Sequence, residues 1–114
     1  MKTSDIRREY QYTELHRRDL AKNPLVQFAK WLEEATQHEA IPDPTAMVLA
    51  TVNAQGQPAQ RTVLLKNYDD AGFTFFTNLQ SHKSEDMVAN AKVSLLFQWL
   101  PQSRQAIIQG TVQR

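Results

Sequence analysis

Two clusters of polar and basic side chains have the residue types that an anion-binding site requires. The first is Arg61-Thr62-Val63-Leu64-Leu65-Lys66, where a cation stands near each end of an otherwise apolar stretch. The second runs from Phe76-Thr77-Asn78 to Ser81-His82-Lys83-Ser84 and combines hydroxyls, a lysine and the expected start of a helix. Charged side chains near apolar segments need partners, and helix amino termini with nearby hydroxyls and cations bind phosphate. Together the clusters predict a phosphate flanked by Arg61, Thr77, Ser81 and Lys83.

Each acidic or basic group also has a purely structural interpretation. Arg61 and Lys66 could lie at the margins of a sheet and extend their charged ends into solvent. Glu85 and Asp86 fall in the first turn of the expected short helix, where the helix dipole and solvent account for both carboxylates. The pair Asp69-Asp70, close to a glycine, is typical of a turn rather than of acid–base chemistry.

The composition excludes several other kinds of site. The 114 residues include no cysteine, so disulfides, thiolate metal sites and a cysteine nucleophile are excluded. The three glycines lie far apart, which excludes a glycine-rich phosphate loop and leaves side chains as the phosphate ligands. The three histidines lack a metal-binding spacing, and no G-x-S-x-G motif surrounds a serine. We therefore expect no metal and assign no catalytic residue.

Net charge and hydropathy limit the partners. A net charge of +1 argues against a nucleic-acid-binding β-barrel, because such proteins usually carry a basic excess. The longest apolar run, Ala46-Met47-Val48-Leu49-Ala50, is far too short to span a membrane, and the first twenty residues are too charged for a signal peptide. Together with the lack of cysteine, this favours a cytoplasmic protein with no nucleic-acid or membrane partner.

The elements that must position these residues are one long helix and a series of strands. A charged arm is expected over residues 1–22, and Asn23-Pro24 followed by helically spaced apolar residues predicts an amphipathic helix over 24–38. Alternation and turn signals predict five strands, with a short helix at 82–89 before the last two, and a meander of two hairpins among the first three. The expected strands are 45–52, 58–66, 73–77, 93–99 and 105–112. The last strand needs a neighbour at its edge, so we expect a partner chain or a longer protein.

Motifs in a fixed order along the chain carry a resemblance to a known enzyme family. They are Arg7-Arg8-Glu9-Tyr10, the segment 25–31, Asp43-Pro44-Thr45-Ala46-Met47, Gly56-Gln57-Pro58, Gln60-Arg61, Val63-Leu64-Leu65-Lys66, Phe75-Phe76-Thr77-Asn78, Ser81-His82-Lys83, Val93-Ser94-Leu95-Leu96-Phe97 and Arg104-Gln105. In this order they resemble the amino-terminal half of pyridoxamine 5′-phosphate oxidase, and the ordered set is more specific than any one motif.

The resemblance implies a fold, a reaction and an assembly. The fold would be mainly β with flanking helices, an antiparallel split β-barrel of the FMN-binding type. It would be incomplete in this chain, with an arm at 1–22 and a partial barrel domain at 23–114. The enzyme would be a homodimer that uses FMN and oxygen to oxidise pyridoxamine or pyridoxine 5′-phosphate to pyridoxal 5′-phosphate in vitamin B6 salvage. The alternative is a catalytically inactive module that binds a flavin or a B6 phosphate.

The resemblance also implies site residues. Lys66 would face the substrate as well as FMN, and Arg7 and Tyr10 would belong to an arm that covers the substrate. His82 stands where the family usually has a second cation, and family members continue well beyond residue 114. The expected FMN contacts are Arg61, Thr62, Val63, Leu64, Leu65, Lys66, Phe76, Thr77, His82 and Lys83, with Gln105 reaching the FMN from the partner subunit.

Overall fold

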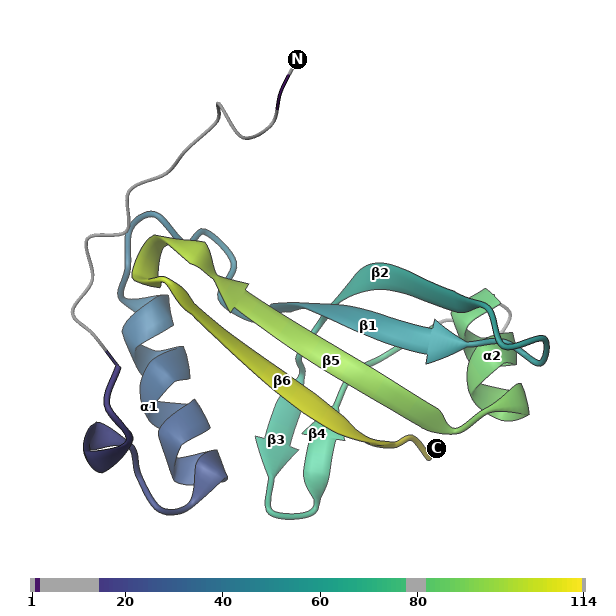
Figure 1. The fold of residues 1–114 in the computed structure, drawn as a ribbon, viewed down its shortest axis with the longest axis horizontal. Helices are drawn as coiled ribbons and strands as arrows, with labels where there is room; N and C mark the ends of the chain where they lie inside the picture. Colours follow the sequence, from purple (N-terminus) through teal and green to yellow (C-terminus); the bar gives the residue numbers. More distant parts are fainter. Residues whose placement is uncertain (1, 3–14, 78–81, 114) are drawn as a thin grey trace.

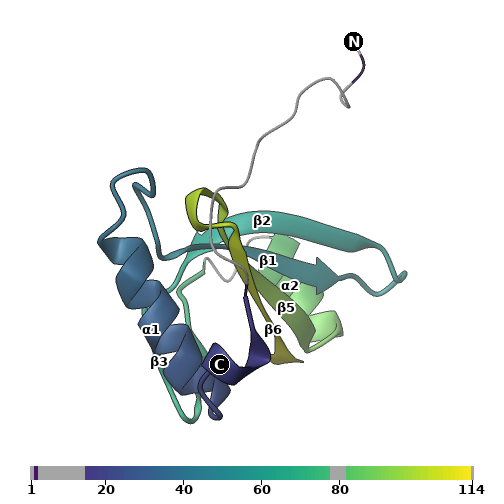
Figure 2. The ribbon, with the colours of Figure 1, turned by 60° about the vertical axis from the view of Figure 1, so that its left-hand side comes forward.

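The main layer of the protein is a four-stranded antiparallel sheet with the strand order β2-β1-β5-β6. The computed structural model describes residues 2, 15–77 and 82–113. A separate two-stranded ribbon crosses below the sheet, and helices α1 and α2 lie at opposite ends of it (Figures 1 and 2). The elements are η2 (Arg17–Asp19), α1 (Pro24–Thr36), β1 (Ala46–Val52), β2 (Pro58–Leu64), β3 (Asn67–Asp69), β4 (Gly72–Thr74), α2 (His82–Ala89), β5 (Lys92–Trp99), η3 (Leu100–Gln102) and β6 (Arg104–Thr111).

Helix α1 begins where the sequence predicts. Asn23 caps it, because its Oδ1 accepts the backbone N–H of Leu25 at 2.9 Å, and Pro24 occupies the first helical position. The helix ends at Thr36, two residues before the expected end. Phe28 and Ala35 are its buried residues, so the apolar stripe packs inward as its spacing predicts.

An aromatic cluster around Phe28 joins α1 to both sheets. The Phe28 ring meets Tyr68 and Phe73 of the β3–β4 ribbon at 5.1 and 5.2 Å between centroids, both nearly edge-on. It also meets Phe97 and Trp99 of β5 at 5.0 and 5.9 Å. Such pairs contribute about 0.5–1.5 kcal/mol each beyond the burial of apolar area. The cluster therefore fixes α1 and the ribbon against the same end of β5.

The strand arrangement corrects two expectations. Six strands are present in the described residues instead of five, because the expected second strand ends at Leu64 and Asn67–Asp69 forms a strand of its own. The first hairpin of the expected meander is present as β1 and β2, but the second hairpin is wrong. β4 pairs with β3, and β1 lies between β2 and β5. Within the ribbon, Asp69 Oδ1 accepts the N–H groups of Ala71 and Gly72 at 2.8 and 3.2 Å and closes the tight turn between β3 and β4.

The remaining strands follow the sequence pattern. On β5, Leu95, Phe97 and Trp99 are buried, as their alternation predicts. The turn before β2 has Gly56 at φ +85°, the left-handed conformation expected of a glycine there. β2 and β6 are the edges of the sheet, which does not close on itself. The expectation of a mainly antiparallel β fold with flanking helices and an incomplete barrel is confirmed. Among the described residues, no helix is long and apolar enough to cross a bilayer.

Candidate functional site

A pocket of about 610 Å³ lies where β2 leaves the sheet and enters the ribbon. Two backbone hydrogen bonds shape this corner. Leu65 N donates to Thr45 O at 3.0 Å, and Lys66 N donates to Thr74 O at 2.8 Å. These bonds bring the end of β2, the start of β1 and the segment after β4 around one space. The residues lining the pocket are Thr45, Thr62, Val63, Leu64, Leu65, Lys66, Phe76 and Thr77.

The pocket combines three threonines, one ammonium group and an exposed aromatic ring. Phe76 is 75% exposed, and Lys66 Nζ lies 6.0 Å from the centroid of its ring. The hydroxyl of Thr77 is buried and has no hydrogen-bond partner among the described residues. Because a buried hydroxyl without a partner is costly, its placement suits a ligand with polar atoms. A flat, partly apolar ligand bearing acceptor groups fits this lining.

Arg61 is not among the residues that line this pocket. It shares the inner face of β2 with Val63, and its Nη1 donates to Thr51 Oγ1 on β1 at 2.7 Å. Its Nη2 lies 3.6 Å from Asp86 Oδ2 on α2, forming an ion pair. The suggestion that Arg61 only extends into solvent is therefore wrong, because its side chain is 23% exposed and lies between β1 and α2.

Asp86 is a residue whose role the sequence did not reveal. We interpreted its carboxylate as a solvated group near a helix start. In the structure it is 16% exposed and accepts a hydrogen bond from Thr51 Oγ1 at 3.0 Å. Its partners lie 25 and 35 positions earlier in the chain, and nothing in the local sequence around Asp86 points to them. Thr45 also lines the pocket, although the sequence indicates it only as part of a family motif and not as a site residue.

Gln105 lies apart from the first pocket. It is exposed on β6 and lines a second pocket of about 350 Å³ with Leu100, Ser103 and Arg104. Ser103 adopts a left-handed conformation at φ +54°, which turns the chain from η3 into β6. The structure therefore does not bring Gln105 together with Lys66 and Phe76 within one chain.

Several expected site residues lie outside the described residues. These are Arg7, Tyr10 and Ser81, whose expected roles stay predictions. The backbones of His82 and Lys83 form the first turn of α2, but the structure does not describe their side chains. Seven of the expected FMN residues, Thr62 to Lys66 with Phe76 and Thr77, line the first pocket.

The fold and the pocket define a class, and two comparisons with solved structures support it. The crystal structure of PhzG from Burkholderia lata 383, in complex with tetrahydrophenazine-1-carboxylic acid, superposes with a TM-score of 0.78 at 25% identity. It covers 88% of this chain and 50% of that one. A pyridoxamine 5′-phosphate oxidase-related, FMN-binding protein from Nostoc punctiforme superposes with a TM-score of 0.65 at 19% identity. The superposition covers 81% of this chain and 47% of that one. The fold is that of the split-barrel FMN-binding proteins.

The sequence comparisons give the family. The model of the family described as pyridoxamine 5′-phosphate oxidase matches residues 33–114. The chain belongs to the pyridoxamine 5′-phosphate oxidase family.

Similar curated proteins carry the same family name. The pyridoxine/pyridoxamine 5′-phosphate oxidase of Hahella chejuensis is 55% identical over 114 residues, which is 100% of this chain and 54% of the relative. That of Shewanella sediminis is 55% identical over 96% of this chain and 51% of the relative. That of Bordetella pertussis is 49% identical over 100% of this chain and 54% of the relative. The chain therefore spans about half the length of the curated relatives it matches.

Proposed function

We propose that this chain supplies the FMN-binding half of an oxidase that converts pyridoxamine or pyridoxine 5′-phosphate to pyridoxal 5′-phosphate. Family membership supports an oxidoreductase that uses a flavin. The observation that carries the proposal is the pocket at the end of β2, because seven residues that the family resemblance assigns to FMN line it together. FMN, when bound there, would accept the hydride removed from substrate C4′ and be reoxidised by oxygen.

The residues of the pocket fit such a cofactor. The hydroxyl of Thr77, which has no partner among the described residues, offers a hydrogen bond to a polar edge of the ligand. The exposed ring of Phe76 and the aliphatic residues Val63 and Leu65 offer apolar contact. Lys66, exposed beside Phe76, would hold the substrate close to the cofactor through its ammonium group.

Arg61 and the first turn of α2 would bind the cofactor phosphate. The glycine-poor sequence leaves this task to side chains, and a charge-assisted hydrogen bond to phosphate is roughly twice as strong as a neutral one. Lys83 and His82 occupy the first turn of α2, where the partial positive charge of the helix also favours an anion.

The proposal includes a homodimer in the cytoplasm. Gln105 lies in a second pocket, apart from Lys66, so its expected contact with FMN requires a second subunit. The arm that carries Arg7 and Tyr10 would cover the bound substrate.

Flavin binding tests the proposal directly. FMN and riboflavin are titrated separately against the chain, and quenching of flavin fluorescence gives each dissociation constant. A phosphate site predicts that FMN binds at least about 10-fold more tightly than riboflavin. Equal affinity would remove the phosphate site, and no binding of either flavin would contradict the proposed function. Binding of FMN without oxidation of pyridoxamine 5′-phosphate, even when the chain is extended by the second half of the Hahella chejuensis relative, would favour an inactive flavin-binding module.

A further inference from the structure

A buried hydroxyl connects Arg61 to a carboxylate on another element. Thr51, on β1, is 0% exposed. Its Oγ1 accepts from Arg61 Nη1 at 2.7 Å and donates to Asp86 Oδ2 at 3.0 Å. Because a hydroxyl has a single proton, donating it to Asp86 leaves the oxygen lone pairs to receive Arg61. Three elements, β1, β2 and α2, are thus joined through one oxygen atom.

The hydrogen bonds that the Arg61 guanidinium makes with described residues all involve its Nη1 atom. Besides Thr51, Nη1 approaches the carbonyl oxygens of Leu49 and Ala59 at 3.2 and 3.4 Å. Nη2 lies 3.6 Å from Asp86 Oδ2, close enough for charge attraction but longer than a hydrogen bond. No described residue accepts a hydrogen bond from Nε. A guanidinium is planar, so fixing Nη1 also fixes the direction of its remaining donors.

We propose that Thr51 and Asp86 are positioning residues that set the plane in which Arg61 presents Nε and Nη2 to the phosphate of FMN. The inference rests on the proposed function, since it takes FMN phosphate as the anion that Arg61 binds. Neither Thr51 nor Asp86 lines the pocket at the end of β2, and both contact Arg61, so we assign them a role that acts through Arg61. Asp86 also follows Lys83 by three positions on α2, so the same contact would hold the first turn of α2 beside Arg61.

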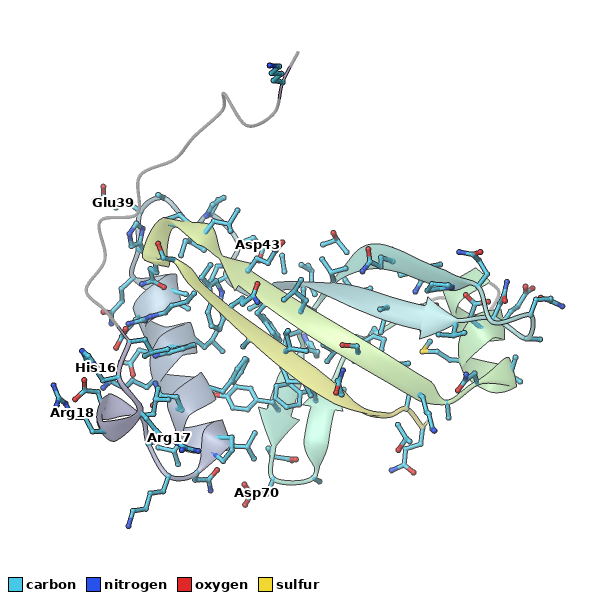
Figure 3. The ribbon with its side chains drawn as sticks, viewed as in Figure 1. His16, Arg17, Arg18, Glu39, Asp43 and Asp70 are labelled. Atoms are coloured by element: carbon cyan, nitrogen blue, oxygen red, sulfur yellow. The ribbon has the colours of Figure 1, made fainter. Side chains whose placement is uncertain are left out.

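Conservative variants of Thr51 separate positioning from simple packing. Thr51→Val keeps the shape of the side chain but removes the hydroxyl, whereas Thr51→Ser keeps the hydroxyl. We expect Thr51→Val to weaken FMN binding by about 5- to 20-fold, the effect of one hydrogen bond, and Thr51→Ser to restore most of the affinity. Asp86→Asn should also weaken binding. Asp70→Asn is the matched control, because it makes the same chemical change at the tip of the β3–β4 ribbon (Figure 3).

A double-mutant cycle shows whether the effect passes through Arg61. In an Arg61→Ala background, Thr51→Val should change FMN affinity by less than about 2-fold, because the group that it positions is gone. Thermal unfolding of each variant is recorded in parallel. If Thr51→Val lowers the melting temperature but leaves FMN affinity unchanged, the contact is purely structural and the inference is wrong. An equal loss in both backgrounds would also overturn it.

A measurement without cofactor keeps the inference independent of FMN binding. In the chain alone, the NMR signal of the Arg61 Nε–H group reports whether the guanidinium is held in one orientation. The signal should show a rigid side chain in the parent and in Thr51→Ser, and a mobile one in Thr51→Val. If the parent binds no FMN, the proposed function fails. The Arg61 Nε–H signal would still show whether Thr51 holds the guanidinium in one orientation. A mobile Arg61 in the parent would refute the positioning role.

Discussion

The guanidinium of Arg104 lies over the indole ring of Trp31, with its Cζ atom 4.8 Å from the ring centroid. The same group donates a hydrogen bond to the carboxylate of Glu34. Trp31 and Glu34 belong to α1, whereas Arg104 begins the edge strand β6, immediately before Gln105. Arg104 therefore links α1 to β6, the strand whose Gln105 is expected to contact the FMN bound by the partner subunit.

Arg104→Gln should lower the free energy of unfolding by about 1 kcal/mol. The change removes a half-buried ion pair, typically ~0.2–1 kcal/mol, and a cation–π contact of about 0.5–1 kcal/mol. Urea denaturation followed by tryptophan fluorescence measures the effect. Lys92→Gln on β5 is the control, since it removes the same charge from an exposed strand position. Equal stabilities of the two variants would show that the contact with α1 contributes nothing.

Phe28→Ala should destabilise the protein by about 3–5 kcal/mol, the usual cost of removing a large buried aromatic ring. Phe28 is at the centre of the aromatic cluster, with four ring neighbours from the ribbon and from β5. Val26→Ala, at an exposed position of the same helix, should change stability by less than about 0.5 kcal/mol. Urea denaturation compares the two variants. Similar midpoints would mean that α1 is not anchored through Phe28.

Arg61→Ala and Lys83→Ala should each weaken FMN binding by roughly 10- to 150-fold. Each change removes a charge-assisted hydrogen bond of about 1.5–3 kcal/mol. Quenching of flavin fluorescence measures both affinities, and Lys30→Ala on the exposed side of α1 controls for the loss of one positive charge. If both variants bind FMN like the parent, the phosphate site lies elsewhere.

His82→Arg should strengthen FMN binding mainly at alkaline pH. Histidine stands where the family usually has a second permanent cation, and an ordinary imidazole is charged only below about pH 6.5. At about pH 5.5 an ordinary histidine already carries its charge, so the advantage of arginine should shrink there. FMN titrations of both proteins at pH 5.5 and pH 8.5 give the comparison. The same ratio of affinities at both pH values would indicate that residue 82 does not contact the phosphate.

Local patterns predicted both α-helices, most of the strands and the β1–β2 hairpin, but not strand β3 or the remaining strand pairings. The cap at Asn23 and the alternation of β5 depend on neighbouring residues, so the sequence revealed both. The sheet order was not predictable in this way. β1 has β5 as its second neighbour, and that pairing depends on packing between segments far apart in the chain.

The same distinction applies to the candidate site. Thr62 to Lys66 form one continuous run, so their common location near a sheet margin was accessible from the sequence. The partner of Arg61 was not, because Asp86 reaches it only after α2 packs against β1. The helix dipole alone accounts for a carboxylate in the first turn of a helix. The sequence therefore gave no reason to expect that Asp86 contacts Thr51.

The central claim is that this chain provides the FMN half of a pyridoxamine 5′-phosphate oxidase. Its most direct test measures hydrogen peroxide and pyridoxal 5′-phosphate formed from pyridoxamine 5′-phosphate with added FMN and oxygen. The chain is compared with a version extended by the second half of the Hahella chejuensis relative, which is about twice as long. We predict full turnover only in the extended protein, because misplacing the substrate by about 1 Å can cost ~100-fold in rate. Turnover by neither protein, with no FMN bound, would contradict the account.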